Sequence, residues 1–165
     1  MRMTLTAHAV VGAGIVAAMP VHPILGLCAA FASHFVLDAI PHWGYPIHSP
    51  SLRPDIRAPL KFDRALFLDF VTMGSDALLG LVLAILLFAT PSTFLLVLAG
   101  ACAGEAPDTF HFFYTRYPHE PFLSIFRFHA WIQSEDIFRE RPVLGIASQI
   151  TFIAVFTGAV KLIVF

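Results

Sequence analysis

Long apolar segments make up most of this chain, and short proline-containing turns or polar loops separate them. The segments cover residues 4–19, 24–40, 62–89, 92–114 and 142–165. Each is close to the length that a helix needs to cross ~30 Å of hydrocarbon. Because a backbone in lipid must satisfy its own polar groups, such segments are expected to be helical. Hydrophobic residues form 58% of the 165 residues and charged residues 13%, which is unlike a soluble domain. We therefore expect a single all-α integral membrane domain with about five transmembrane helices.

Two longer loops, 41–61 and 115–141, connect these segments. The first carries five prolines and is expected to be irregular. The second contains an aromatic stretch at 122–133, which predicts an interfacial helix. Its aromatic residues suit the lipid headgroup level, and Arg127 suits a lipid phosphate. Anchoring alone would also explain this stretch.

Basic residues gather on one side of the predicted bundle. With five spans, the N-terminus and both longer loops share a side, and only Lys161 falls opposite. The residues on the shared side are Arg2, Arg53, Arg57, Lys61, Arg64, Arg116, Arg127, Arg139 and Arg141. The positive-inside rule makes that side cytoplasmic, which predicts an N-in, C-out topology.

The net charge of −1 argues against a nucleic-acid partner. Cys28 and Cys102 lie in apolar runs without CxxC spacing and are expected to be small buried residues.

Acids and histidines interrupt the apolar segments. They are His8, His34, Asp38, Asp69, Asp76, Glu105 and Asp108. An ionisable group in hydrocarbon is costly unless it is paired, hydrated or bound to metal, so it marks a candidate functional site. These residues come from four helices, and at 1.5 Å per residue most fall in one slab near the cytoplasmic ends. Convergence of carboxylates and imidazoles at similar depth predicts a metal site.

Local spacing supports that prediction. His34 and Asp38 are four residues apart and share a helix face, although a capping or supporting role would fit as well. Pro107 frees backbone carbonyls in the preceding turn, which suits a cation site. Asp69 can alternatively pair with Arg64 or Lys61 at the interface.

The predicted metal ligands are His8, His34, Asp38, Asp76, Asp108 and His111. Mixed imidazole and carboxylate ligands favour Zn, Mn or Fe, and their number allows for two ions. Such a centre suits phosphoester hydrolysis. Glu105 or Asp69 would then be the general base, and His129, His42 or Arg127 would stabilise the leaving phosphate.

The chain resembles a group of small bacterial membrane proteins. The resemblance rests on His8, the Ser33–Trp43 block (SHxxxDxxPHW), Asp76 before Leu78–Gly80, Pro107–Asp108, and Phe128–Gln133 (FHxWIQ). That group is loosely similar to the YdjM-type inner-membrane metal-dependent hydrolases. The resemblance implies a metal-dependent hydrolase of the bacterial inner membrane. The substrate that we expect is a phosphoester on a membrane lipid or lipid-linked phosphate, reached through the loops 41–61 and 115–141.

Two other functions remain open on the sequence. Intramembrane acids and histidines also form ion paths, so a metal or proton transporter is one alternative. A non-catalytic assembly protein with a buried polar network is the other. A homodimer is compatible with all three.

Overall fold

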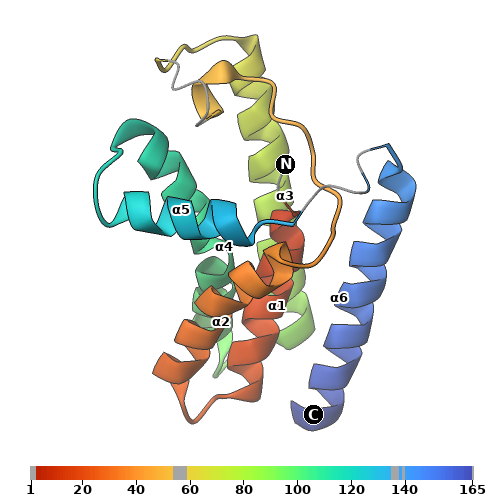
Figure 1. Cartoon of the computed structure of the whole chain (residues 1–165). Coiled ribbons are helices and arrows are strands. Elements are labelled where there is room, and N and C mark those ends of the chain that lie inside the picture. The colour runs from red at the N-terminus through yellow and green to blue at the C-terminus, as the bar shows by residue number, and fades with distance from the viewer. Residues whose placement is uncertain (1–2, 54–58, 135–137, 139, 165) are drawn as a thin grey trace.

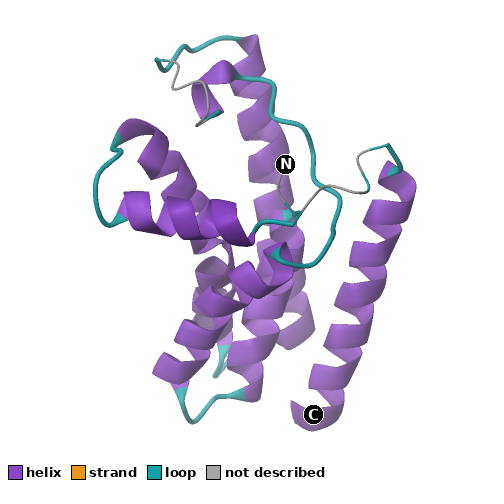
Figure 2. Cartoon of the chain, viewed as in Figure 1, coloured by secondary structure: helices purple, strands orange, loops and turns teal. Residues whose placement is uncertain are grey.

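The computed structural model describes residues 3–53, 59–134, 138 and 140–164, except for the side chains of residues 111 and 115. Figure 2 shows helices and loops, and no strand within these ranges. The helices are α1 (Leu5–Ala18), α2 (Pro23–Asp38), α3 (Arg64–Phe88), α4 (Phe94–Arg116), α5 (Phe122–Ile132) and α6 (Pro142–Val164), with a short 3₁₀ helix at Pro50–Leu52. The all-helical prediction is confirmed.

Local sequence explains where several helices begin. Pro23 is the first residue of α2, a position that needs no backbone N–H. The side chain of Asp63 caps α3 by accepting a 2.9 Å hydrogen bond from the N–H of Leu66. The side chain of Thr4 makes no such cap on α1, so α1 depends on another helix for this function.

Helix α1 is the centre of the fold, and α2, α3, α4 and α6 pack around it (Figure 1). Nearly all of its residues are buried. Glycines allow α1 and α4 to approach each other closely. A Cβ on Gly12 would collide with the carbonyl of Gly100, and one on Gly104 would collide with the carbonyl of His8. Such small-residue contacts let two backbones approach closely.

The outer helices α3 and α6 are long and apolar enough to cross a membrane. Only 11% of the apolar window of α3 and 22% of that of α6 is buried. The other apolar helices are shorter, at 14 residues for α1, 16 for α2 and 11 for α5. The described residues thus contain two candidate spans by this measure, where the sequence predicted about five.

Cys28 and Cys102 are exposed, so the prediction that they are buried is wrong; they lie on the outer faces of α2 and α4.

Helix α5 runs across the bundle instead of along it (Figure 1). Aromatic rings attach it to α4. Phe126 stacks on Tyr114 with 4.0 Å between ring centroids, and Phe122 stacks on Phe113 at 5.8 Å. The predicted helix at 122–133 is therefore present, and one of its faces is fixed to α4.

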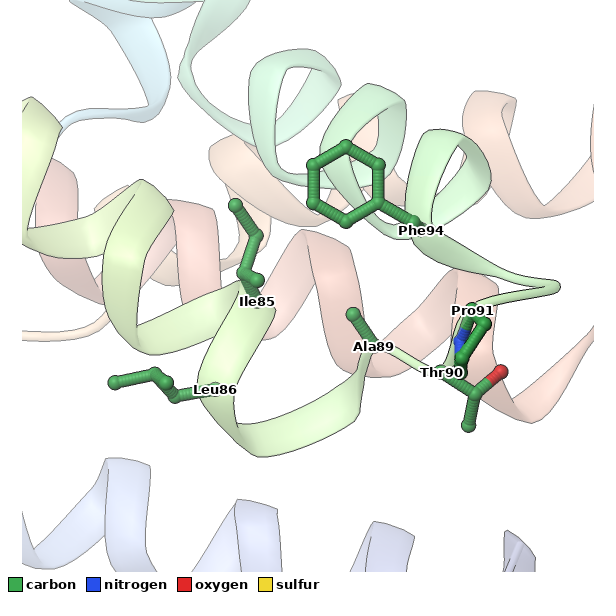
Figure 3. Close-up of a pocket in the computed structure, with 6 residues that line it drawn as sticks. All are labelled: Ile85, Leu86, Ala89, Thr90, Pro91 and Phe94. Carbon is green, nitrogen blue, oxygen red and sulfur yellow. The ribbon is translucent and has the colours of Figure 1, made fainter.

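An open apolar hollow lies at the turn between α3 and α4. Figure 3 shows its lining residues, which are Ile85, Leu86, Ala89, Thr90, Pro91 and Phe94. Phe94 begins α4, and Asp108 follows 14 residues later, or about 21 Å along a helix. The hollow is therefore remote from Asp108 and the buried polar residues around it.

Candidate metal centre

Side chains from four helices meet around the carboxylate of Asp38. Asp38 ends α2, and His34 lies one turn earlier on the same face. Helix α1 contributes His8, α4 contributes Asp108 and α5 contributes His129. None of the five residues is more than 5% exposed. The structure therefore brings together four of the predicted ligands, and it adds His129, for which the sequence predicted a phosphate-stabilising role.

Three imidazoles face the two oxygens of Asp38. His129 Nε2 lies 2.5 Å from Oδ2, and His34 Nε2 lies 3.4 Å from the same oxygen. His8 Nε2 lies 3.4 Å from Oδ1. The rings of His8 and His34 are stacked, with centroids 3.9 Å apart. A buried carboxylate needs compensation for its lost hydration, and here imidazoles surround it.

A backbone carbonyl fixes the orientation of His34. Its Nδ1 lies 2.8 Å from the carbonyl oxygen of Gly104. Because a carbonyl can only accept, Nδ1 carries a proton, and when the ring is neutral Nε2 presents a lone pair. That lone pair points toward Asp38 and Asp108. Histidines that bind metals commonly have this arrangement, with the second nitrogen bonded to a carbonyl or carboxylate.

Several polar atoms in the centre lack hydrogen bonds. Within the described residues, both nitrogens of His8, Nε2 of His34 and Oδ1 of Asp38 are buried without a hydrogen-bond partner. Buried polar groups are nearly always satisfied in native proteins, because an unsatisfied group costs ~1–3 kcal/mol. A cation between Nε2 of His8, Nε2 of His34 and Oδ1 of Asp38 would satisfy these three atoms together.

Two overlapping groups of side chains can hold a metal ion. One is His8, His34 and Asp38, and the other is His34, Asp108 and His129. In each group the donor atoms lie within 4.8 Å of one another. His34 belongs to both, and its Nε2 is 4.0 Å from Asp108 Oδ1. Imidazole and carboxylate donors fit Zn, Mn or Fe.

The segment after α2 and the end of α5 close one side of the centre. His42 Nδ1 lies 2.7 Å from the carbonyl oxygen of Ile40, and its Nε2 lies 4.0 Å from Asp38 Oδ1 and 3.2 Å from Gln133 Nε2. The backbone N–H of Ser134 donates to the carbonyl of Asp38 at 2.8 Å. The sequence did not point to Ser134, because its contact with Asp38 is made by the backbone and has no residue signature.

Asp76, a predicted metal ligand, caps α1 in this structure. Its carboxylate accepts hydrogen bonds from the N–H of Leu5 at 2.6 Å, the N–H of Thr6 at 3.3 Å and the Thr6 hydroxyl at 2.7 Å. A carboxylate at a helix N-terminus satisfies free N–H groups and interacts favourably with the helix dipole. Asp76 belongs to neither metal-capable group.

The two predicted general bases also lie outside these groups. Asp69 binds the loop before α3, accepting from the N–H of His48 at 3.1 Å and the N–H of Ser49 at 2.7 Å. Glu105 faces α3, where a Cβ on Gly80 would lie 3.3 Å from its Oε1. Within the described residues this buried oxygen has no hydrogen-bond partner.

The remaining predicted site residues are Arg127 and His111. Arg127 is exposed, and it precedes the buried His129 by two residues, which corresponds to about 200° around a helix. It therefore lies on the face of α5 opposite the centre. His111 is in α4, but its side chain lies outside the described part of the structure.

Gln149 connects three segments beside the centre. Its amide nitrogen donates to the Trp43 carbonyl at 2.7 Å, and its oxygen accepts from the Thr4 hydroxyl at 2.7 Å. This links α6 to the segment after α2 and to the start of α1.

No protein-family model, curated protein or solved structure matches this chain.

Proposed function

We propose that this chain is an integral membrane protein that binds a divalent transition metal between α1, α2, α4 and α5 and uses it to hydrolyse a lipid-borne phosphoester. The ligands are His8, His34, Asp38, Asp108 and His129. One observation carries the proposal. Three buried imidazoles and two buried carboxylates converge from four helices, and several of their donor atoms have no hydrogen bond within the described residues.

The spacing of the donors supports metal binding. Two ligands about 2.1 Å from a tetrahedral ion lie about 3.4 Å from each other. His8 Nε2 and His34 Nε2 each lie 3.4 Å from an oxygen of Asp38. The second group is looser, at 4.0 Å between His34 and Asp108. A small movement of α4 or of the Asp108 side chain would complete the set.

The outer surface supports a membrane location. Large apolar side chains are exposed along both candidate spans, including Leu86 at 74% and Leu162 at 89%. A long apolar helix in the core of a soluble protein would be mostly buried. Exposed apolar faces of this size mark contact with lipid or another protein. Helix α1 is too short to span ~30 Å alone, but its neighbours surround it, so only the outer helices need to match the bilayer.

The proposed reaction is hydrolysis. These ligands would hold a divalent ion that would supply Lewis acidity for hydrolysis, in which water adds to phosphorus and the lipid alcohol leaves. His42, whose Nε2 lies 4.0 Å from Asp38 Oδ1, is the first candidate for proton transfer. Glu105, on the neighbouring turn of α4 from Asp108, is the second candidate. Arg127 is assigned no catalytic step, because its side of α5 faces away from the centre.

Elemental analysis of detergent-purified protein tests the first part of this proposal. We expect stoichiometric Zn, Mn or Fe in the wild type and loss of that metal in His34→Ala and Asp108→Ala. His119→Ala is the matched control, because His119 is exposed in the loop before α5. Wild-type protein that remains folded without metal after being supplied with these ions would overturn the proposal.

Phosphate release from a lipid phosphomonoester, such as a polyprenyl phosphate, in mixed micelles tests the second part. The metal-loaded wild type should release phosphate, whereas His34→Ala should not. Uptake of metal into proteoliposomes without hydrolysis would assign the centre to transport instead.

A further inference from the structure

The five residues of the metal centre are buried from solvent, and α5 covers one side of them. His129 of α5 reaches Asp38 in the interior. Helix α5 is held to α4 by aromatic contacts. It is held to α2 by His129, by the edge contact of Phe128 with Phe35 at 5.0 Å, and through Ser134, which follows α5 and donates to the carbonyls of Asp38 and Ile40. Any substrate that enters from this side must therefore pass α5.

The opposite face of α5 has a different composition. Taking His129 as the reference, each residue adds about 100° around the helix. Arg127 and Trp131 then fall about 160° and 200° away, on the outward face. Trp131 is 78% exposed, and Arg127 is also exposed. Phe128 lies at the edge of this face, with its ring 5.9 Å from that of Trp131.

This combination matches the polar–apolar boundary of a membrane. Trp rings prefer the headgroup level, and arginine binds phosphate oxygens through two parallel hydrogen bonds. Helix α5 runs across the bundle (Figure 1), so it would lie parallel to the membrane if α3 and α6 cross it. Other exposed cations lie near the same ends of the helices, namely Arg64 at the start of α3 and Arg141 just before α6. Their charge complements an anionic lipid surface.

We propose that the outward face of α5 binds the phosphate headgroup of an anionic phospholipid through Arg127 and Trp131, and that this lipid holds His129 in the metal centre. The lipid-binding part stands on the exposed face of α5 alone. The coupling to His129 rests on the proposed function. Lipid binding on one face of α5 and metal binding on the other then favour the same position of this helix, so each stabilises the other. The centre would then retain its metal ion best where an anionic phospholipid is bound to α5.

Fluorescence of Trp131 in nanodiscs tests the lipid-binding part. A Trp43→Phe background leaves Trp131 as the sole tryptophan. Discs of mixed phosphatidylcholine and phosphatidylglycerol carry a brominated chain on one lipid or the other. We expect phosphatidylglycerol to be enriched about fivefold around Trp131, the factor for one arginine at an anionic surface. Arg127→Gln should abolish the enrichment, whereas Arg64→Gln, which removes an equal charge at an exposed position outside α5, should leave most of it.

Three results would overturn the proposal. Equal quenching by the two lipids would remove the anionic preference. If Arg64→Gln lost the phosphatidylglycerol enrichment to the same extent as Arg127→Gln, the enrichment would be due to the total positive charge at that end of the molecule and not to Arg127. Absence of quenching by either lipid would mean that a second copy of the chain, or another protein, covers α5.

Chelator-driven metal loss tests the coupling in the same discs. The half-time should lengthen when phosphatidylglycerol replaces part of the phosphatidylcholine, and Arg127→Gln should eliminate the difference. If the wild type binds no metal at all, the proposed function fails, but the quenching result still decides whether α5 binds lipid. If metal binds and its loss is independent of lipid, only the coupling fails.

Discussion

The carboxylate of Asp38 is the group on which the buried centre depends most. His8, His34 and His129 all approach its two oxygens, and its backbone carbonyl receives the N–H of Ser134. A buried charge of this kind is tolerated only when its surroundings compensate for the lost hydration. The imidazoles and a bound cation would together provide that compensation.

Gly104 is a second residue with two separate structural roles. Its carbonyl orients His34, and its missing side chain admits the backbone of His8. We predict that Gly104→Ala destabilises the protein by about 1–3 kcal/mol, the usual cost of overpacking, because the added methyl would meet backbone that cannot move aside. Thermal unfolding in detergent measures this effect.

Gly74→Ala is the matched control for that substitution. Gly74 lies within α3, where an added Cβ would meet no atom within 4 Å. Alanine is favoured over glycine in a helix by up to ~1 kcal/mol, so this variant should be as stable as the wild type or slightly more so. If the two alanine variants lost stability equally, the close contact between α1 and α4 would not be the cause.

Helix α1 obtains its N-terminal cap from a neighbouring helix. Asp76 of α3 accepts three hydrogen bonds from Leu5 and Thr6. We predict that Asp76→Ala lowers stability by about 1–3 kcal/mol, because it leaves N–H groups of α1 unsatisfied. Metal stoichiometry should be retained, since Asp76 lies outside both metal-capable groups. Parallel unfolding and elemental analysis check both expectations.

Asp76→Asn provides the graded comparison. Its amide oxygen can still accept a hydrogen bond, so it should lose less stability than Asp76→Ala. Loss of the metal in both variants without a change in unfolding temperature would contradict the capping role and restore Asp76 as a ligand.

The arrangement of the whole molecule makes a prediction about membrane sidedness. The α3–α4 turn and the α4–α5 loop lie at opposite ends of α4. In a background of Cys28→Ser and Cys102→Ser, we expect an impermeant maleimide to label Ser92→Cys only from outside the cell. His119→Cys should be labelled only from the cytoplasmic side. Both positions are exposed. Labelling of both cysteines from the same side would contradict a bundle in which α4 crosses the membrane.

The helices of this protein could be located from the sequence because their signals are local. Apolar runs of sufficient length, interrupted by Pro20, Pro41 and Pro91, define the segments in which α1 to α4 lie. The i, i+4 relation of His34 and Asp38 also depends only on helix geometry. The number of residues between each acid or histidine and the end of its helix was enough to place most of them near one end of the bundle.

The tertiary structure decided which of these groups meet. Asp38, Asp69 and Asp76 are all acids in apolar helices, and the sequence does not distinguish their environments. Rotation of each helix about its axis, set by contacts such as Gly104 against His8, directs Asp38 into the centre, Asp76 onto the end of α1 and Asp69 onto the loop before α3. Likewise, only the packing of α5 across α2 and α4 brings His129 inward and leaves Arg127 outside. Periodicity shows which residues share a face, but side-chain packing between helices determines what that face contacts.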